Sequence, residues 1–151
     1  MLDLLRTFPD TLRALIAAVP PALTRTRSHE GFFAAVEHAW HLADLEVEGY
    51  GERLQRIAEE DEPAVPDFKG DVIAEQRRYL ELELEPALQR FAVARAANVA
   101  RMETFTDEQW QRGGEQEGVG RVTLARVAEM MAEHDAGHAA ELHALLSELT
   151  T

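Results

Sequence analysis

The sequence contains no cysteine. This absence excludes disulfides, a protein thiol nucleophile and thiolate metal ligands, so histidine and the carboxylates remain as ligand types. Basic residues are also scarce, since 15 lysines and arginines stand against 28 acidic residues and give a net charge of −13. Such a charge repels phosphate backbones and anionic lipid surfaces at long range. We therefore expect neither nucleic acid nor a membrane as a partner.

Long uncharged hydrophobic runs are missing as well. The first residues, MLDLLRTFPD, show no basic region followed by an apolar run, and no stretch stays free of charge for the roughly 18 residues that a membrane span needs. These absences predict a cytoplasmic protein. The length of 151 residues suits one domain, residues 1–151, with a sizeable core.

Hydrophobic residues recur at three- and four-residue spacing along most of the chain, which is typical of helices with one buried face. The predicted helices are a first up to about Val19, a second from about Ser28 to Glu60, a third from about Asp71 to Thr104 and a fourth from Thr123 to the C-terminus. Pro86 is expected to kink the third helix near Glu85. No strand pattern is visible, so the sequence predicts an all-α four-helix bundle.

The six histidines form two groups, one on the second predicted helix and one on the fourth: His29, His38 and His41, and His134, His138 and His143. A spacing of four residues places His134 and His138 on one face of a helix, in line with its apolar stripe. Buried imidazoles need hydrogen-bond partners or a metal, because an unpaired buried polar atom costs about 1 to 3 kcal/mol. The pair therefore indicates a metal site, with hydrogen-bonded core histidines or solvated surface histidines as the alternatives.

A third ligand is expected from the second helix. We favour His41, which directly follows Trp40 within residues 40–46, over His38, which follows Glu37 one turn earlier and nearer the rim. His38 is interpreted as a partly exposed residue or one that contacts a ligand histidine. His29 and His143 lie toward helix ends and are interpreted as surface residues.

Three imidazoles without a thiolate suit Zn²⁺, Ni²⁺, Fe²⁺, Co²⁺ or Mn²⁺ and leave a coordination position open for water or substrate. Such an open site is typical of catalytic rather than structural metal centres. Asp44, Glu48 and Asp135 are near enough in sequence to accept hydrogen bonds from the imidazoles, although each also fits a solvated surface charge.

Two motifs resemble those of the DinB-like helical bundles, in which a His-Leu-x-Asp-x-Glu motif supplies one metal histidine and a final His-x-x-x-His supplies two. Here they read His41-Leu42-Ala43-Asp44-Leu45-Glu46 and His134-Asp135-Ala136-Gly137-His138, and residues 66–70, 75–79 and 122–124 are also similar to the family. The resemblance covers nearly the whole chain. It implies an antiparallel bundle with a long crossover between the second and third helices, a divalent metal and often a homodimer.

The resemblance leaves the reaction open. Better understood relatives use low-molecular-weight thiols such as mycothiol or bacillithiol as cofactors. We therefore predict that the protein is a metal-dependent hydrolase or a thiol-dependent S-transferase and that it binds a small-molecule ligand. The alternatives are a non-catalytic metal-binding or stress-response bundle, and an interaction module whose histidines hold no ion.

Two further sets of residues are candidates for a ligand pocket. The excess of acidic residues gives no obvious basic pocket for an anionic thiol. Six arginines could still converge on one site: Arg25, Arg27, Arg77, Arg78, Arg121 and Arg126. Four aromatic residues fit either a pocket lining or the core, which is the commoner place for aromatics at helical spacing: Trp40, Phe68, Tyr79 and Trp110.

Overall fold

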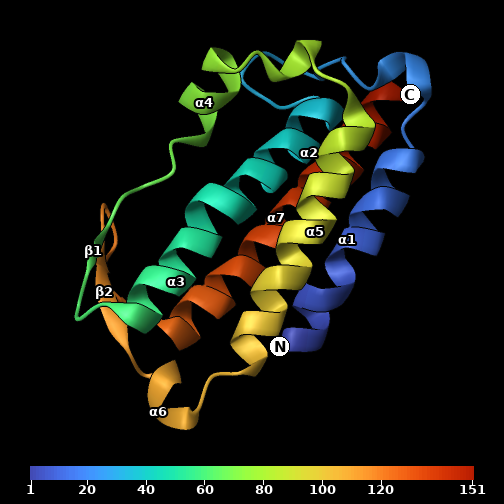
Figure 1. Cartoon of the computed structure of the whole chain (residues 1–151). Helices are drawn as coiled ribbons and strands as arrows, with labels where there is room; N and C mark the ends of the chain where they lie inside the picture. Colours follow the sequence, from blue (N-terminus) through green and yellow to red (C-terminus); the bar gives the residue numbers. More distant parts are fainter.

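A computed structural model describes all residues, 1–151, and confirms the helical bundle (Figure 1). Its long elements are α1 (Leu2–Ala17), a continuous helix made of α2 (Ala35–Asp44), η2 (Leu45–Gly51) and α3 (Glu52–Glu59), then α5 (Leu84–Glu103) and α7 (Leu124–Leu149). The chain between α3 and α5 runs back along the bundle, so α5 starts at the same end as α2 (Figure 1). None of the helices combines the length and the apolar character that a membrane span requires.

The core consists of two apolar clusters with a buried polar layer between them. On α5, Arg95 lies between Phe91 of one cluster and Val99 of the other, and it is only 1% exposed. The corresponding part of α7 carries Asp135 and His138, which are also buried. The bundle therefore places its ionisable side chains inside the core, where each needs a partner.

Arg95 is the centre of this polar layer. Its guanidinium donates to both carboxylate oxygens of Glu46 at 2.9 and 3.0 Å and to those of Asp135 at 2.7 and 2.9 Å. It also donates to the backbone carbonyl of Leu5 at 3.0 Å. Asn98 adds a hydrogen bond of 2.8 Å to Glu46. The network joins α1, η2, α5 and α7 through one side chain.

The second helix changes to π-helical winding at η2, where Glu46 enters the polar layer. A β-carbon at Gly51 would lie 3.0 Å from the carbonyl oxygen of Glu46 and 3.3 Å from Oδ1 of Asn98. Glycine therefore leaves room for Asn98 to approach this segment. The wider winding occurs mostly as single turns within α-helices, frequently near functional sites.

The predicted start of the second helix near Ser28 is wrong, because α2 begins at Ala35. Residues 28–32 instead form turns and bends. The side chain of Glu37 accepts a hydrogen bond from the backbone N–H of Ala34 at 3.0 Å, which caps the helix there. Arg27 donates to both oxygens of Glu37 at 2.7 Å and so holds the preceding loop against the helix start.

The predicted third helix is also interrupted. A short helix α4 (Gly70–Gln76) ends before Arg78, which adopts a left-handed conformation with φ of 54°, and a 3-10 turn η3 (Tyr79–Glu81) follows. The kink expected near Glu85 is therefore wrong. Pro86 lies in the first turn of α5, where a missing N–H leaves no intrahelical bond unmade.

Three short strands correct the expectation that the chain contains none. They are β1 (Ala64–Val65), β2 (Gly113–Gln116) and β3 (Gly120–Thr123), with β1 parallel and β3 antiparallel to β2. Strands of two to four residues are too short to show an alternating pattern. The remaining elements are η1 (Pro21–Leu23) and the capped turn α6 (Asp107–Trp110), and Thr123 caps α7 as expected.

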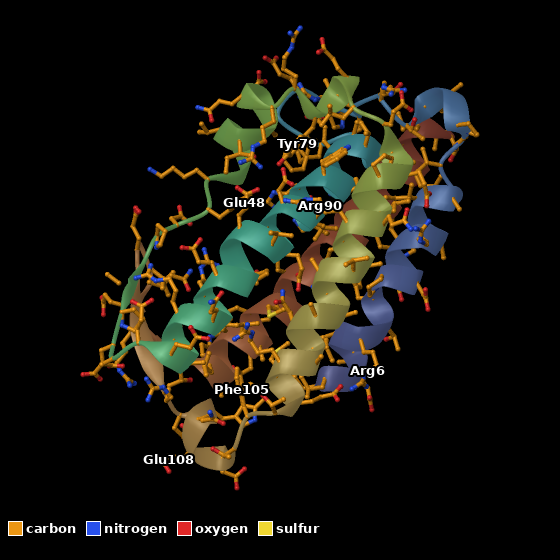
Figure 2. All side chains as sticks on the ribbon, in the orientation of Figure 1. Arg6, Glu48, Tyr79, Arg90, Phe105 and Glu108 are labelled. Atoms are coloured by element: carbon orange, nitrogen blue, oxygen red, sulfur yellow. The ribbon has the colours of Figure 1, made fainter.

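Asp44 anchors the crossover to the bundle. It is 4% exposed and accepts hydrogen bonds from the hydroxyl of Tyr79 at 2.5 Å, from Arg77 at 2.8 Å and from Arg90 at 3.0 Å. Arg77 also donates to both oxygens of Glu48. Figure 2 shows Glu48, Tyr79 and Arg90 in the half of the bundle that α4 covers. These contacts hold the segment from α4 to η3 against α2.

Replacing Arg95 by leucine is expected to lower the free energy of unfolding by about 3 to 5 kcal/mol, because two buried carboxylates lose their charge partner. Urea denaturation followed by circular dichroism measures the change. Arg13→Leu is the matched control, since Arg13 pairs with both oxygens of Glu85 on the surface at 2.9 and 3.0 Å. Exposed pairs contribute about 1 kcal/mol or less. Equal losses in the two variants would contradict the role given to Arg95.

Candidate metal centre

Three histidines from two helices converge at one point. Nε2 of His134 lies 3.3 Å from Nε2 of His41, on α2, and 3.0 Å from Nε2 of His138, one turn further along α7. One ligand atom from each of the three residues lies within 4.8 Å of the other two. The structure therefore brings together the three histidines that the sequence indicates as metal ligands.

Hydrogen bonding cannot satisfy this cluster. A ring nitrogen offers either one proton or one lone pair, so Nε2 of His134 has no means of making ordinary hydrogen bonds to His41 and His138 at once. Metal–nitrogen bonds of about 2.1 Å place the nitrogens of a tetrahedral ion about 3.4 Å apart, close to the observed separations. The arrangement of the three residues therefore suits binding of a divalent cation better than hydrogen bonding among the imidazoles.

Burial keeps the imidazoles neutral, which is the form that binds a metal. Desolvation lowers the pKa of His41 to about 4, that of His134 to about 3 and that of His138 to about 2. The neighbouring histidines lower the pKa of His134 and His138 further, whereas Asp71 and Asp44 act in the opposite direction on His41. Near neutral pH all three therefore present lone pairs without first losing a proton.

The outward nitrogens of two ligands have no partner. Nδ1 of His41 and Nδ1 of His134 are buried and form no hydrogen bond. The ring of His41 packs directly on the start of α4, since a β-carbon at Gly70 would lie 2.6 Å from Cε1 and 2.8 Å from Nδ1 of that ring. Gly70 thus permits the crossover to cover the metal centre.

His38 lies beside the centre and contacts a ligand histidine, which is the second of the two interpretations that the sequence allowed. It is only 1% exposed, so the expectation of partial exposure is wrong. Its Nδ1 is 2.8 Å from Nδ1 of His138, and Phe33 packs edge-on against its ring. The loop before α2 covers this turn of the helix, which spacing along α2 does not reveal. His29 and His143 are exposed, as expected.

The three carboxylates predicted to orient the imidazoles have other partners, which corrects that expectation. Asp44 and Glu48 accept from Arg77, and Asp135 accepts from Arg95. None of the three carboxylates accepts a hydrogen bond from an imidazole. Asp44 still influences the site through space, since its charge raises the pKa of His41 against the lowering by burial.

A pocket of about 320 Å³ opens onto the centre from the loop before α2. Its lining combines two of the ligand histidines with a loop and two carboxylates: Gly31, Phe32, Phe33, His41, Asp71, His138 and Glu141. Asp71 and Glu141 were not predicted from the sequence. The position of Glu141 could have been predicted, since it follows His138 by three residues and therefore lies on the same face of the helix. The position of Asp71 could not, because only the crossover brings it to the site.

The arginines considered for this pocket do not converge. Arg27 pairs with Glu37, and others pair with carboxylates elsewhere on the surface: Arg77 with Glu48, Arg78 with Glu81, Arg121 with Glu62 and Arg126 with Glu133. Arg25 donates to backbone carbonyls of residues 80 and 82. Among the four aromatics considered, Phe68 packs near His41, while Trp40 stacks on Tyr79 and Trp110 packs on Phe105.

The metal-free protein is expected to lose stability as the pH falls from about 6.5 toward 5. Unfolded histidines take up protons near pH 6.5, whereas His38 and His41 in the folded chain have a pKa of about 4 and His134 of about 3. Protons therefore favour the unfolded state, by up to about 1.4 kcal/mol per pH unit for each such histidine. Urea denaturation of chelator-treated protein at pH 7.5, 6 and 5 measures the slope.

His134→Gln should flatten this dependence, and His143→Gln, which removes an exposed histidine of the same helix, should not. The interval above pH 5 separates histidines from most carboxylates, whose ordinary pKa lies near 4. A slope that is the same in all three proteins would show that the buried imidazoles do not govern it.

Comparisons with known proteins agree with this architecture. The family model for the DinB superfamily matches residues 4–142. The solved structure of YfiT from Bacillus subtilis aligns over 98% of this chain and 85% of its own, with a TM-score of 0.89 and 19% sequence identity. That protein is described as "a probable metal-dependent hydrolase with an unusual four-helix bundle topology". A search of curated proteins finds no match. Because the family model matches most of the chain, this chain belongs to the DinB superfamily.

Proposed function

We propose that this protein is a hydrolase that depends on a divalent metal held by His41, His134 and His138. The observation that carries the proposal is the convergence of three neutral imidazole Nε2 atoms beside a pocket lined by two carboxylates. When bound, Zn²⁺ or a similar ion supplies a Lewis acid that polarises a substrate oxygen and acidifies a water. Three protein ligands leave a position for that water.

Glu141 is the group that takes up the proton from the attacking water, and Asp71 lies beside it. Both line the pocket together with His41 and His138. Burial and the nearby charge of Asp71 raise the pKa of Glu141, which makes it a better proton acceptor at neutral pH. Phe32 and Phe33 form the apolar side of the pocket and favour a substrate with an apolar part.

The solved structure with the same fold supports hydrolysis, since YfiT is described as a probable metal-dependent hydrolase. At 19% identity this likeness concerns the fold, so the histidine cluster of the present chain carries the chemical argument. The homodimer that the family resemblance implies stays a prediction.

The charge around the pocket favours hydrolysis over transfer to an anionic thiol. An adjoining hollow of about 310 Å³, which shares Asp71 and both phenylalanines with the pocket, adds three more acidic side chains, Glu30, Glu37 and Glu75. Its one arginine, Arg27, is already paired with Glu37. Negative cofactors are therefore repelled, and neutral or cationic substrates are admitted.

Protein purified without a chelator or a histidine tag is expected to carry close to one divalent metal ion per chain. His134→Ala combined with His138→Ala should abolish binding, because two of three ligands are lost. His143→Ala, an exposed histidine on the same helix, should leave the metal content unchanged. Elemental analysis measures the stoichiometry. No metal in the native chain, even after reconstitution, would favour an interaction module whose histidines hold no ion.

Glu141→Gln and Asp71→Asn should each leave the metal content intact, and Glu141→Gln, which removes the proton acceptor, should lower kcat about 10² to 10⁴-fold. The assay uses neutral and cationic esters and amides, with and without a low-molecular-weight thiol. Turnover only with the thiol would replace the hydrolase by an S-transferase. Full metal loading without turnover in either assay would indicate a non-catalytic metal-binding bundle.

A further inference from the structure

A fourth buried histidine touches the metal centre without belonging to it. His38 lies one turn before His41 on α2, and its Nδ1 is 2.8 Å from Nδ1 of His138. The two rings meet edge to face, with centroids 5.0 Å apart and an angle of 83°. His138 therefore uses both ring nitrogens, Nε2 toward His134 and Nδ1 toward His38.

The protonation pattern of this pair follows from the metal centre. A neutral imidazole carries one proton, so His138 offers the Nε2 lone pair to an ion only when its proton is on Nδ1. At 2.8 Å one nitrogen of the pair must donate and the other accept. The proton of His138 then points at His38, whose Nδ1 accepts it.

We propose that His38 is a positioning residue that accepts the Nδ1–H of His138 and holds that imidazole in the tautomer whose Nε2 lone pair faces His41 and His134. The inference rests on the metal centre of the proposed function, but not on the reaction assigned to it. Partners of this kind fix the orientation of a ligand histidine and raise its basicity.

The surroundings of His38 are consistent with this role. With Nδ1 as acceptor, its own proton resides on Nε2, which faces Oε2 of Glu141 at 3.8 Å. The negative carboxylate stabilises an N–H that points toward it. Phe33 packs edge-on against the ring at a centroid distance of 5.5 Å and restricts its rotation. The same oxygen of Glu141 lies 3.9 Å from Nδ1 of His138, so Glu141, His38 and His138 form a triangle beside the metal centre in which only the two histidines are within hydrogen-bond distance.

The same three residues also form a group whose ligand atoms lie within 4.8 Å of one another, which raises the possibility of a second ion. Such an ion would require His138 to lose its remaining proton and bridge two metals. The separation of 2.8 Å between the Nδ1 atoms is a hydrogen-bond distance and is shorter than the about 3.4 Å expected around a tetrahedral ion. The geometry favours the hydrogen bond.

Two substitutions at one position test the proposal. His38→Leu fills the space without an acceptor, whereas the amide oxygen of His38→Asn can take the place of Nδ1. Zinc affinity, measured by competition with a chromophoric chelator, should weaken about 10 to 100-fold in the leucine variant and stay close to the native value in the asparagine variant. Unchanged affinity in the leucine variant, or equal losses in both, overturns the proposal.

Nitrogen-15 NMR of the imidazoles gives a second readout that a merely structural role would not move. In the native chain loaded with zinc we expect the protons of His138 on Nδ1 and of His38 on Nε2. Metal coordination through Nδ1 of His138 overturns the proposal. Binding of two zinc ions per chain that falls to one in His38→Leu also overturns it, in favour of a second metal site.

The experiment separates this inference from the proposed function. A native chain that binds no zinc defeats the proposed function, and the NMR of the metal-free chain still decides the inference. A proton on Nδ1 of His138 supports the hydrogen bond to His38, and a proton on Nε2 of His138 overturns it. Should His38→Leu fail to fold by circular dichroism, the asparagine variant and the native spectra decide the question.

Discussion

The buried charge of Arg95 is the constraint on which the site depends. It joins Glu46, five residues after His41, to Asp135, which directly follows His134. One guanidinium therefore holds both helices that carry the ligand histidines. A buried salt-bridge network is compatible with a stable fold only when every charge has its partner, because a buried charge without a partner keeps its desolvation penalty. This requirement disfavours any shift of α7 along α2 and so fixes the distance between their imidazoles.

A second ionic anchor acts on the crossover. Asp44 binds Tyr79 and Arg77, which follow α4, and Glu48 binds the same arginine. These contacts hold α4 against the bundle and so position Asp71 at the pocket. The Arg95 group is buried throughout, and in the second anchor Asp44 is buried while Arg77 and Glu48 are partly exposed, whereas the metal centre is built from neutral groups. Charges in this bundle thus position the site, and neutral imidazoles form it.

Local patterns in the sequence predict the parts of this arrangement that lie on one helix. The spacing of His134 and His138, the long helices and the cap at Thr123 all follow from residues close in sequence. Contacts between distant segments were not predictable in this way, except that His41, the expected third ligand, does meet His134 across the bundle. The loop over His38 depends on Arg27 meeting Glu37, and the carboxylates expected near the imidazoles are occupied by arginines from other elements.

Burying neutral histidines changes what metal binding requires. Folding has already removed water from the three imidazoles and lowered the pKa of each, so a cation near neutral pH displaces no proton. Without an ion, however, the Nε2 atom of His134 faces two other nitrogens and can bond only one of them. The folded chain therefore holds a histidine cluster whose hydrogen bonding is incomplete without an ion. A bound cation removes this deficiency. Binding an ion then stabilises the bundle as well as completing the site, since the unfolded chain has no such cluster.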